Sequence, residues 1–138
     1  MDMETTPLHF SDSKRIYDEQ KDQSLQRFIT VRGDYDGFHW YEGAPEEVAF
    51  LKHRHAHLFK WEVTIEVFHD DRELEFFMVR DVIRKEILAF TNMLDNLGSC
   101  EMQAERLLQG LINAYGIDRH YTVTISEDGR DDGTCVWN

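Results

Sequence analysis

The sequence has few cysteines, few prolines and no long hydrophobic run. Its 138 residues include two cysteines, Cys100 and Cys135, and two prolines. Two cysteines in an acidic chain of this size do not form a disulfide framework, which indicates a reducing compartment. No apolar run approaches the roughly 20 residues of a membrane span, and the first residues lack the basic and apolar regions of a secretory signal. We therefore expect a cytoplasmic protein with no membrane partner.

Basic residues are also scarce. Lysine and arginine total 15, whereas aspartate and glutamate total 27, which gives a formal charge of −12 and a pI of about 4.9. Such a surface repels nucleic-acid backbones and anionic lipids, so we expect no nucleic-acid partner. An anionic small molecule would bind only in a locally positive pocket, for example beside a metal ion.

Hydrophobic residues make up 41% of the chain, which is enough for the core of one domain at this length. No Gly/Ser-rich linker divides the sequence. We expect a polar N-terminal extension over residues 1–26 and a single domain over residues 27–138. Within the extension, a short helix from about Asp12 and a loose tail are equally compatible with the sequence.

The hydrophobic pattern predicts four strands and two helices in the domain. Alternation indicates strands at residues 27–39, 55–68 and 120–127. Helical spacing indicates helices at residues 77–94 and from an N-cap at Ser99 to Gly116. Residues 41–54 are expected to form a loop with one helical turn, and an acidic turn at 128–133 to precede a short strand at 135–137. The order ββααββ predicts an α+β fold, with an antiparallel sheet and both helices on one face.

Histidines on the second strand suggest a metal site. His55 and His57 share the apolar face and lie roughly 6.5–7 Å apart along the strand. His39 ends the preceding strand and becomes a third ligand if the two strands form a hairpin. Three imidazoles can hold zinc at about 2.0–2.1 Å and leave a position for water or substrate. The alternatives are histidines that simply pack in the core, and His53 as a ligand in place of one of the three.

The run at residues 55–63 (HAHLFKWEV) resembles the His-Gly-His-Asn-Tyr-x-Val-x-Val strand of the 6-pyruvoyl-tetrahydropterin synthase and 6-carboxytetrahydropterin synthase family. Residues 35–40 (YDGFHW) are similar to its Phe-x-Ala-Ala-His-Arg segment, and residues 73–76 (ELEF) to its Met-Val-x-Asp-Phe. Residues 98–104 (GSCEMQA) resemble Pro-Thr-Ser-Glu-x-Leu-Ala at its second helix. Residues 125–127 (ISE) resemble the strand that ends in a ligand-anchoring glutamate. The matches occur in family order over residues 28–137.

The resemblance implies the tunnelling fold, in which ββααββ subunits join their sheets into an oligomeric β-barrel, commonly as trimers stacked into hexamers. It also implies a zinc ion held by the residues that match the family's ligands, His39, His55 and His57. The implied activity is that of a zinc-dependent lyase of the pterin and 7-deazapurine pathways. Its substrate would be a reduced pterin or a related GTP-derived compound such as dihydroneopterin triphosphate, whose side-chain oxygens the zinc would polarise.

Two glutamates are candidates for binding the ligand. Glu127 corresponds to the family's anchor, and a carboxylate accepts two parallel hydrogen bonds from a ring N–H and an exocyclic amine. Glu127 also has the parity of the apolar Val123 and Ile125, so it needs a partner if it is buried; alternatively, it points to water at the end of the strand. Glu101 is a second substrate-side candidate, although acidic residues favour helix N-termini in any case.

The chain departs from the family at the residues that transfer protons in the synthases. The synthases carry a cysteine shortly before His-x-His, whereas residues 49–52 (AFLK) contain none. The family's Asp-His pair is reduced to Asp95. A catalytic role therefore falls to Glu47 or Asp95 as an alternative base. Two further hypotheses remain open: a protein of this fold that binds a pterin or purine-like ligand without synthase activity, and a zinc hydrolase unrelated to pterins.

Overall fold

The computed structural model describes residues 9–138 of the chain. No helix within these residues is long and apolar enough to cross a bilayer. The elements follow one another as α1 (Phe10–Ser24), β1 (Arg27–His39), the 3-10 helix η1 (Glu46–Lys52), β2 (His55–Val67), α2 (Phe76–Met93), α3 (Cys100–Tyr115), β3 (Tyr121–Glu127) and β4 (Asp131–Trp137).

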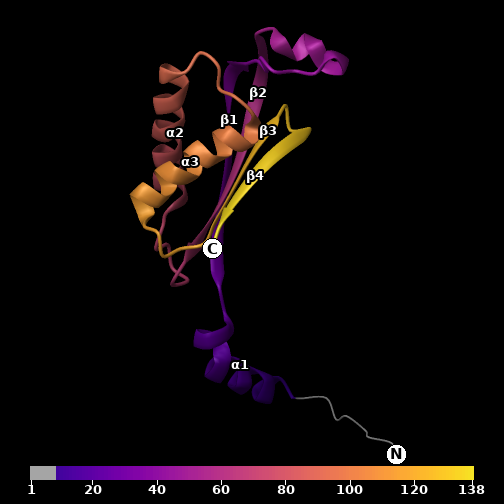
Figure 1. Ribbon diagram of the computed structural model, residues 1–138. Coiled ribbons are helices and arrows are strands. Elements are labelled where there is room, and N and C mark those ends of the chain that lie inside the picture. Colours follow the sequence, from indigo (N-terminus) through magenta and orange to yellow (C-terminus); the bar gives the residue numbers. More distant parts are fainter. Residues whose placement is uncertain (1–8) are drawn as a thin grey trace, which may run out of the picture.

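The domain is one antiparallel sheet with two helices on one face. The strand order is β1-β2-β3-β4, and each strand is antiparallel to its neighbour. Helices α2 and α3 lie on the same side of the sheet (Figure 1). This confirms the predicted α+β class and the order ββααββ. Strands β1 and β4 form the two edges of the sheet.

The core lies between the sheet and the two helices. The odd-numbered residues of β2 from Phe59 to Val67 face the helices and are buried, as the alternation predicts. Residues at helical spacing on α2 and α3 complete the core, among them Val79, Ile83, Leu107 and Leu111. The predicted Ser99 cap is confirmed, because its side chain accepts a hydrogen bond from the N–H of Met102.

In the N-terminal extension, the helical alternative is the one found. Helix α1 begins at Phe10 and has no buried residue. Two ion pairs at i,i+4 spacing, Lys14–Asp18 and Arg15–Glu19, support it. The helix stands apart from the sheet, beyond the start of β1 (Figure 1).

The predicted boundaries of the last hairpin were wrong. Strand β4 begins at Asp131, so residues 128–130 alone make the turn. Asp128 and Gly129 both have positive φ angles, 57° and 76°, which allows the chain to reverse quickly. The first residues of β4 are acidic, so the alternation of apolar and polar residues that indicates a strand is missing there. Gly133 packs there against α3, since a Cβ atom at this position would lie 2.6 Å from the backbone nitrogen of Glu101.

Candidate metal centre

The three histidines singled out from the sequence lie together at one end of the β1–β2 ladder. His39 and His55 are directly paired across the two strands, and His57 follows two residues later on the same face. One ring nitrogen from each of the three lies within 4.8 Å of the others. Their ring centroids are 4.5 to 5.1 Å apart. The predicted hairpin therefore brings the three imidazoles to a common point, and His53 is not part of this cluster.

Hydrogen bonds orient all three rings in the same way. Nδ1 of His39 bonds the carbonyl oxygen of Gly98 at 2.7 Å, and Nδ1 of His55 bonds the carbonyl oxygen of His53 at 2.7 Å. Nδ1 of His57 bonds a carboxylate oxygen of Asp128 at 2.8 Å. Because these acceptors hold the proton on Nδ1, each Nε2 keeps a free lone pair, which is the arrangement that metal-binding histidines require.

The burial of His39 is a further indication that this cluster can bind a metal ion. The residue is 7% exposed, and within residues 9–138 its Nε2 atom is buried without a hydrogen-bond partner. Leaving such a group unsatisfied is costly. Burial lowers the pKa of His39, so the ring is neutral near pH 7. A neutral imidazole with an unoccupied, buried lone pair fits a divalent metal ion.

Asp128 is a functional candidate that the sequence reasoning missed. Its Oδ2 atom accepts from His57, and its Oδ1 atom accepts the backbone N–H of Leu58 at 2.9 Å. The hydrogen bond from His57 is the main reason that the pKa of Asp128 is lowered. The residue lies in the left-handed region, where aspartate is one of the better tolerated residues. The only signal in the sequence was an acidic residue directly after a strand that leads to the site.

Glu127 lies beside the histidines. One carboxylate oxygen is 3.3 Å from Nε2 of His39, and the other is 3.6 Å from Nε2 of His57. Its side chain is about one-third exposed, so it faces both the cluster and the open space next to it. In this position the carboxylate can accept N–H groups of a ligand or approach a metal ion as a fourth ligand.

A cavity of about 800 Å³ opens next to the cluster. Its volume lies within the range of small-molecule sites. His39, His55 and Glu127 line one side. The remaining walls come from the loop after β1, the segment before α3, the first turn of α3 and the start of β4, through Trp40, Tyr41, Glu42, Leu51, Asn96, Gly98, Ser99, Cys100, Glu101, Met102, Asp131 and Asp132.

The remaining predicted site residues are placed differently. Glu101 lines the cavity, as the substrate-side prediction requires. Asp95 and Glu47 are exposed, and neither belongs to the cavity lining. Asn96 turns inward in place of Asp95, because its amide bonds the backbone N–H and carbonyl of Trp40 and accepts the N–H of Gly98. These bonds fix the carbonyl of Gly98 beside His39.

Cys100 is the one cysteine in this cavity, and it is not a reactive thiolate. Burial, helped by the nearby carboxylates of Glu127 and Glu101, raises its pKa to about 12. The thiol therefore stays protonated at neutral pH and is a poor nucleophile. Cys100 does not replace the cysteine that the synthases carry before their His-x-His strand.

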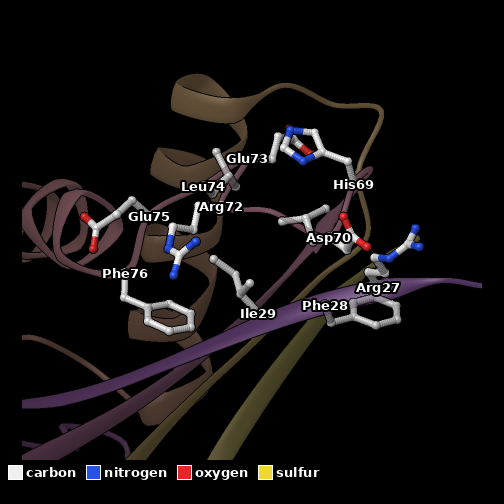
Figure 2. A pocket seen from close by; sticks show the side chains of 11 residues that line it. Arg27, Phe28, Ile29, His69, Asp70, Arg72, Glu73, Leu74, Glu75 and Phe76 are labelled. Atoms are coloured by element: carbon white, nitrogen blue, oxygen red, sulfur yellow. The ribbon is translucent and has the colours of Figure 1, made fainter.

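A second cavity, of about 570 Å³, lies at the opposite end of β1 (Figure 2). Figure 2 shows Arg72 and Ile29 pointing into the space between β1 and the turn before α2. Most of its charged groups already have partners: Glu73 accepts from Arg119, Arg72 donates to Asp71, and Glu75 caps α2. We assign no ligand to this cavity, because these groups are already bonded within the fold.

Comparisons with known proteins identify the fold. The structure resembles a 6-pyruvoyl tetrahydropterin synthase from Plasmodium falciparum, with a TM-score of 0.54 and 13% identity over 80% of this chain and 97% of that one. A 6-pyruvoyl tetrahydropterin synthase from Caenorhabditis elegans gives 0.54 and 14% over 80% and 95%. An uncharacterised protein from Wolinella succinogenes gives 0.51 and 13% over 81% and 98%. No family model and no curated protein sequence matches the chain. The chain therefore shares the fold of these synthases.

Proposed function

We propose that this protein binds zinc through His39, His55 and His57 and takes a reduced pterin or a related GTP-derived compound into the adjoining cavity. In this proposal it is a zinc-dependent enzyme similar to the 6-pyruvoyl and 6-carboxytetrahydropterin synthases. The observation that carries the proposal is the common orientation of the three rings, each bonded through Nδ1 and each with Nε2 free. The fold shared with two such synthases supports it.

Each part of the site has a separate task in this proposal. A bound zinc ion supplies Lewis acidity toward ligand oxygens. Glu127 accepts N–H groups of the ring, and Glu101 borders the same space. Asp128 and the carbonyl oxygens of Gly98 and His53 hold the imidazoles in place. Trp40, Tyr41 and Met102 give the cavity an aromatic and apolar wall for a flat heterocycle.

Binding without synthase activity is the second candidate, and the placement of the acids and thiols favours it. Asp95 and Glu47, which we expected to move protons, lie outside the cavity lining. Cys100 lines the cavity, but its raised pKa keeps the thiol protonated at neutral pH. For Asp95 or Glu47 to act as the base, it must move toward the ligand during the reaction.

Assembly into a trimer or hexamer also belongs to this proposal. Both edges of the sheet, β1 and β4, have open hydrogen-bonding groups along one side within the described chain. Exposed edge strands favour pairing with another chain. Light scattering after size-exclusion chromatography at micromolar concentration tests this, and a monomer would contradict the barrel assembly.

The test of the metal site is the zinc content of the purified protein and of a His55→Ala variant. We expect about one zinc per wild-type chain, because three oriented imidazoles make one complete ligand set. The His55→Ala variant should lose the metal. His53→Ala is the matched control, since it removes a neighbouring imidazole but keeps the backbone carbonyl that bonds His55. A protein that takes up no zinc, even when zinc is supplied, would refute the proposed function.

The enzyme and the binding protein are distinguished by incubating the zinc-loaded protein with 7,8-dihydroneopterin and with its triphosphate. Conversion detected by mass spectrometry, and lost in His55→Ala, identifies an enzyme. Saturable binding with no product identifies the binding protein.

A further inference from the structure

The cavity beside the histidines is strongly acidic. Five carboxylates line it, from Glu42, Glu101, Glu127, Asp131 and Asp132, and none of its described lining residues is a lysine or an arginine. Even with one divalent ion beside these five carboxylates, the formal charge of the cavity is about −3. The raised pKa of Cys100 has the same cause in part, because four of these carboxylates act on the thiol.

The hydrogen-bonding capacity of the lining points in the same direction as its charge. Ionised carboxylates only accept hydrogen bonds. The imidazole N–H groups are already used by Gly98, His53 and Asp128. The indole N–H of Trp40 donates to Glu42 at 3.2 Å. A ligand that satisfies these acceptors must therefore bring its own donors.

Apart from the proposed zinc ion, which is included in the formal charge of the cavity, the feature of the cavity that favours an anion is the N-terminus of α3, and its partial positive charge is already offset. The Ser99 side chain accepts the N–H of Met102, which takes one of the free donors of the first turn. Glu101 supplies a negative charge in the same turn. The space is nevertheless a ligand site and more than a group of acids, because the buried, unpartnered Nε2 of His39 faces it.

We infer that the ligand of this cavity carries no phosphate and is a neutral or cationic heterocycle that presents several N–H donors to the carboxylates. This inference rests on the proposed function and narrows its substrate class. Among reduced pterins, it selects the free side-chain alcohol, as in 7,8-dihydroneopterin, over the triphosphate.

Calorimetric titration of the zinc-loaded protein with 7,8-dihydroneopterin and with its triphosphate tests the inference, with zinc retention checked after each run. The triphosphate should bind at least about tenfold more weakly, because like charges face each other in the complex. The salt dependence gives a second, independent sign. Between about 0.1 M and about 1 M salt the Debye length falls from about 10 Å to about 3 Å, so the triphosphate affinity should rise while that of dihydroneopterin stays nearly constant.

A variant pair assigns the effect to the cavity. Asp131→Asn combined with Asp132→Asn should raise the triphosphate affinity severalfold and should not raise that of dihydroneopterin, for which these carboxylates are acceptors. The matched control is Asp12→Asn with Asp22→Asn, which removes the same charge from α1, where nothing is buried. An equal gain in both variants would show an effect of net charge and overturn the assignment to this cavity.

The two proposals fail in different ways. Triphosphate binding that equals or exceeds that of dihydroneopterin, or that weakens with salt, would overturn this inference and leave the proposed function standing. If neither compound binds to the zinc-loaded protein, the proposed function fails and this inference fails with it.

Discussion

Replacing Asp128 is the change that best tests how the candidate metal centre is built. Its carboxylate bonds Nδ1 of His57 with one oxygen and the backbone N–H of Leu58 with the other. The first bond orients the His57 ring, and the second fixes the carboxylate itself. Asp128→Asn keeps the size of the side chain and suits the left-handed backbone, but it removes the charge and one acceptor. We expect weaker zinc binding with a preserved fold.

The size of the effect follows from these two bonds. Losing the partner of a metal-ligating histidine typically lowers metal affinity by about 10- to 100-fold. Asparagine keeps one carbonyl oxygen that can serve either His57 or Leu58, so Asp128→Asn should fall near the lower limit. Asp128→Gly accepts the positive φ of 57° without strain but removes both acceptors, so it should approach the upper limit.

Competition with a chromophoric zinc chelator measures these affinities, and thermal unfolding of the metal-free proteins monitors the fold. Asp132→Asn is the control, because it removes a charge from the same hairpin without contacting a histidine. If Asp128→Asn, Asp128→Gly and the control all bind zinc within twofold of the wild type, the orienting role assigned to Asp128 is incorrect.

Three further predictions address the rest of the chain. Glu127→Gln should retain zinc and weaken dihydroneopterin binding at least about tenfold, because the amide offers one acceptor in place of two; loss of zinc would make Glu127 a metal ligand instead. The hydrogen bond from Arg119 holds the pKa of Glu73 below its usual value of 4.5, so the contribution of the pair to stability is present above pH 4.5 and is lost as the pH falls through the lowered pKa. Urea unfolding at several pH values should therefore show a smaller acid loss for Glu73→Gln, and identical profiles would contradict this. Gly33→Ala should destabilise the fold by about 1–3 kcal/mol, since its Cβ atom would lie 2.3 Å from the buried ring of Trp61; an unchanged denaturation midpoint would refute it.

The sequence was sufficient to predict the sheet, the helices and the histidine cluster, and the reason is local. Alternation along β2 places His55 and His57 on the core face whatever the rest of the chain does. His39 joins them once β1 and β2 pair as neighbours, which strands adjacent in sequence commonly do. The resemblance to the synthases led to the same residues.

The supporting parts of the site were beyond sequence reasoning because they depend on tertiary contacts. Asp128 reaches His57 only because the β3–β4 turn is short, and the carbonyl of Gly98 reaches His39 only because Asn96 holds the loop before α3. The sequence pattern predicts a turn at Asp131 and Asp132, so it does not place these residues on a strand beside the cavity. Asp95 followed from the resemblance to the family's Asp-His pair and Glu47 from its position shortly before the His-x-His strand, and the structure places neither of them in the cavity lining.

The pairing of His39 with His55 has a consequence for how this protein can vary. Both ends of the loop over residues 40–54 are fixed at the same rung of the β1–β2 ladder. Loop-closure entropy grows slowly with length, by only about 0.6 kcal/mol per doubling. Insertions or deletions in the middle of the loop would therefore leave the imidazoles in place, while reshaping the wall that carries Tyr41 and Leu51. Chain length in this loop is thus a variable that can change the shape of the cavity while the histidine cluster stays the same.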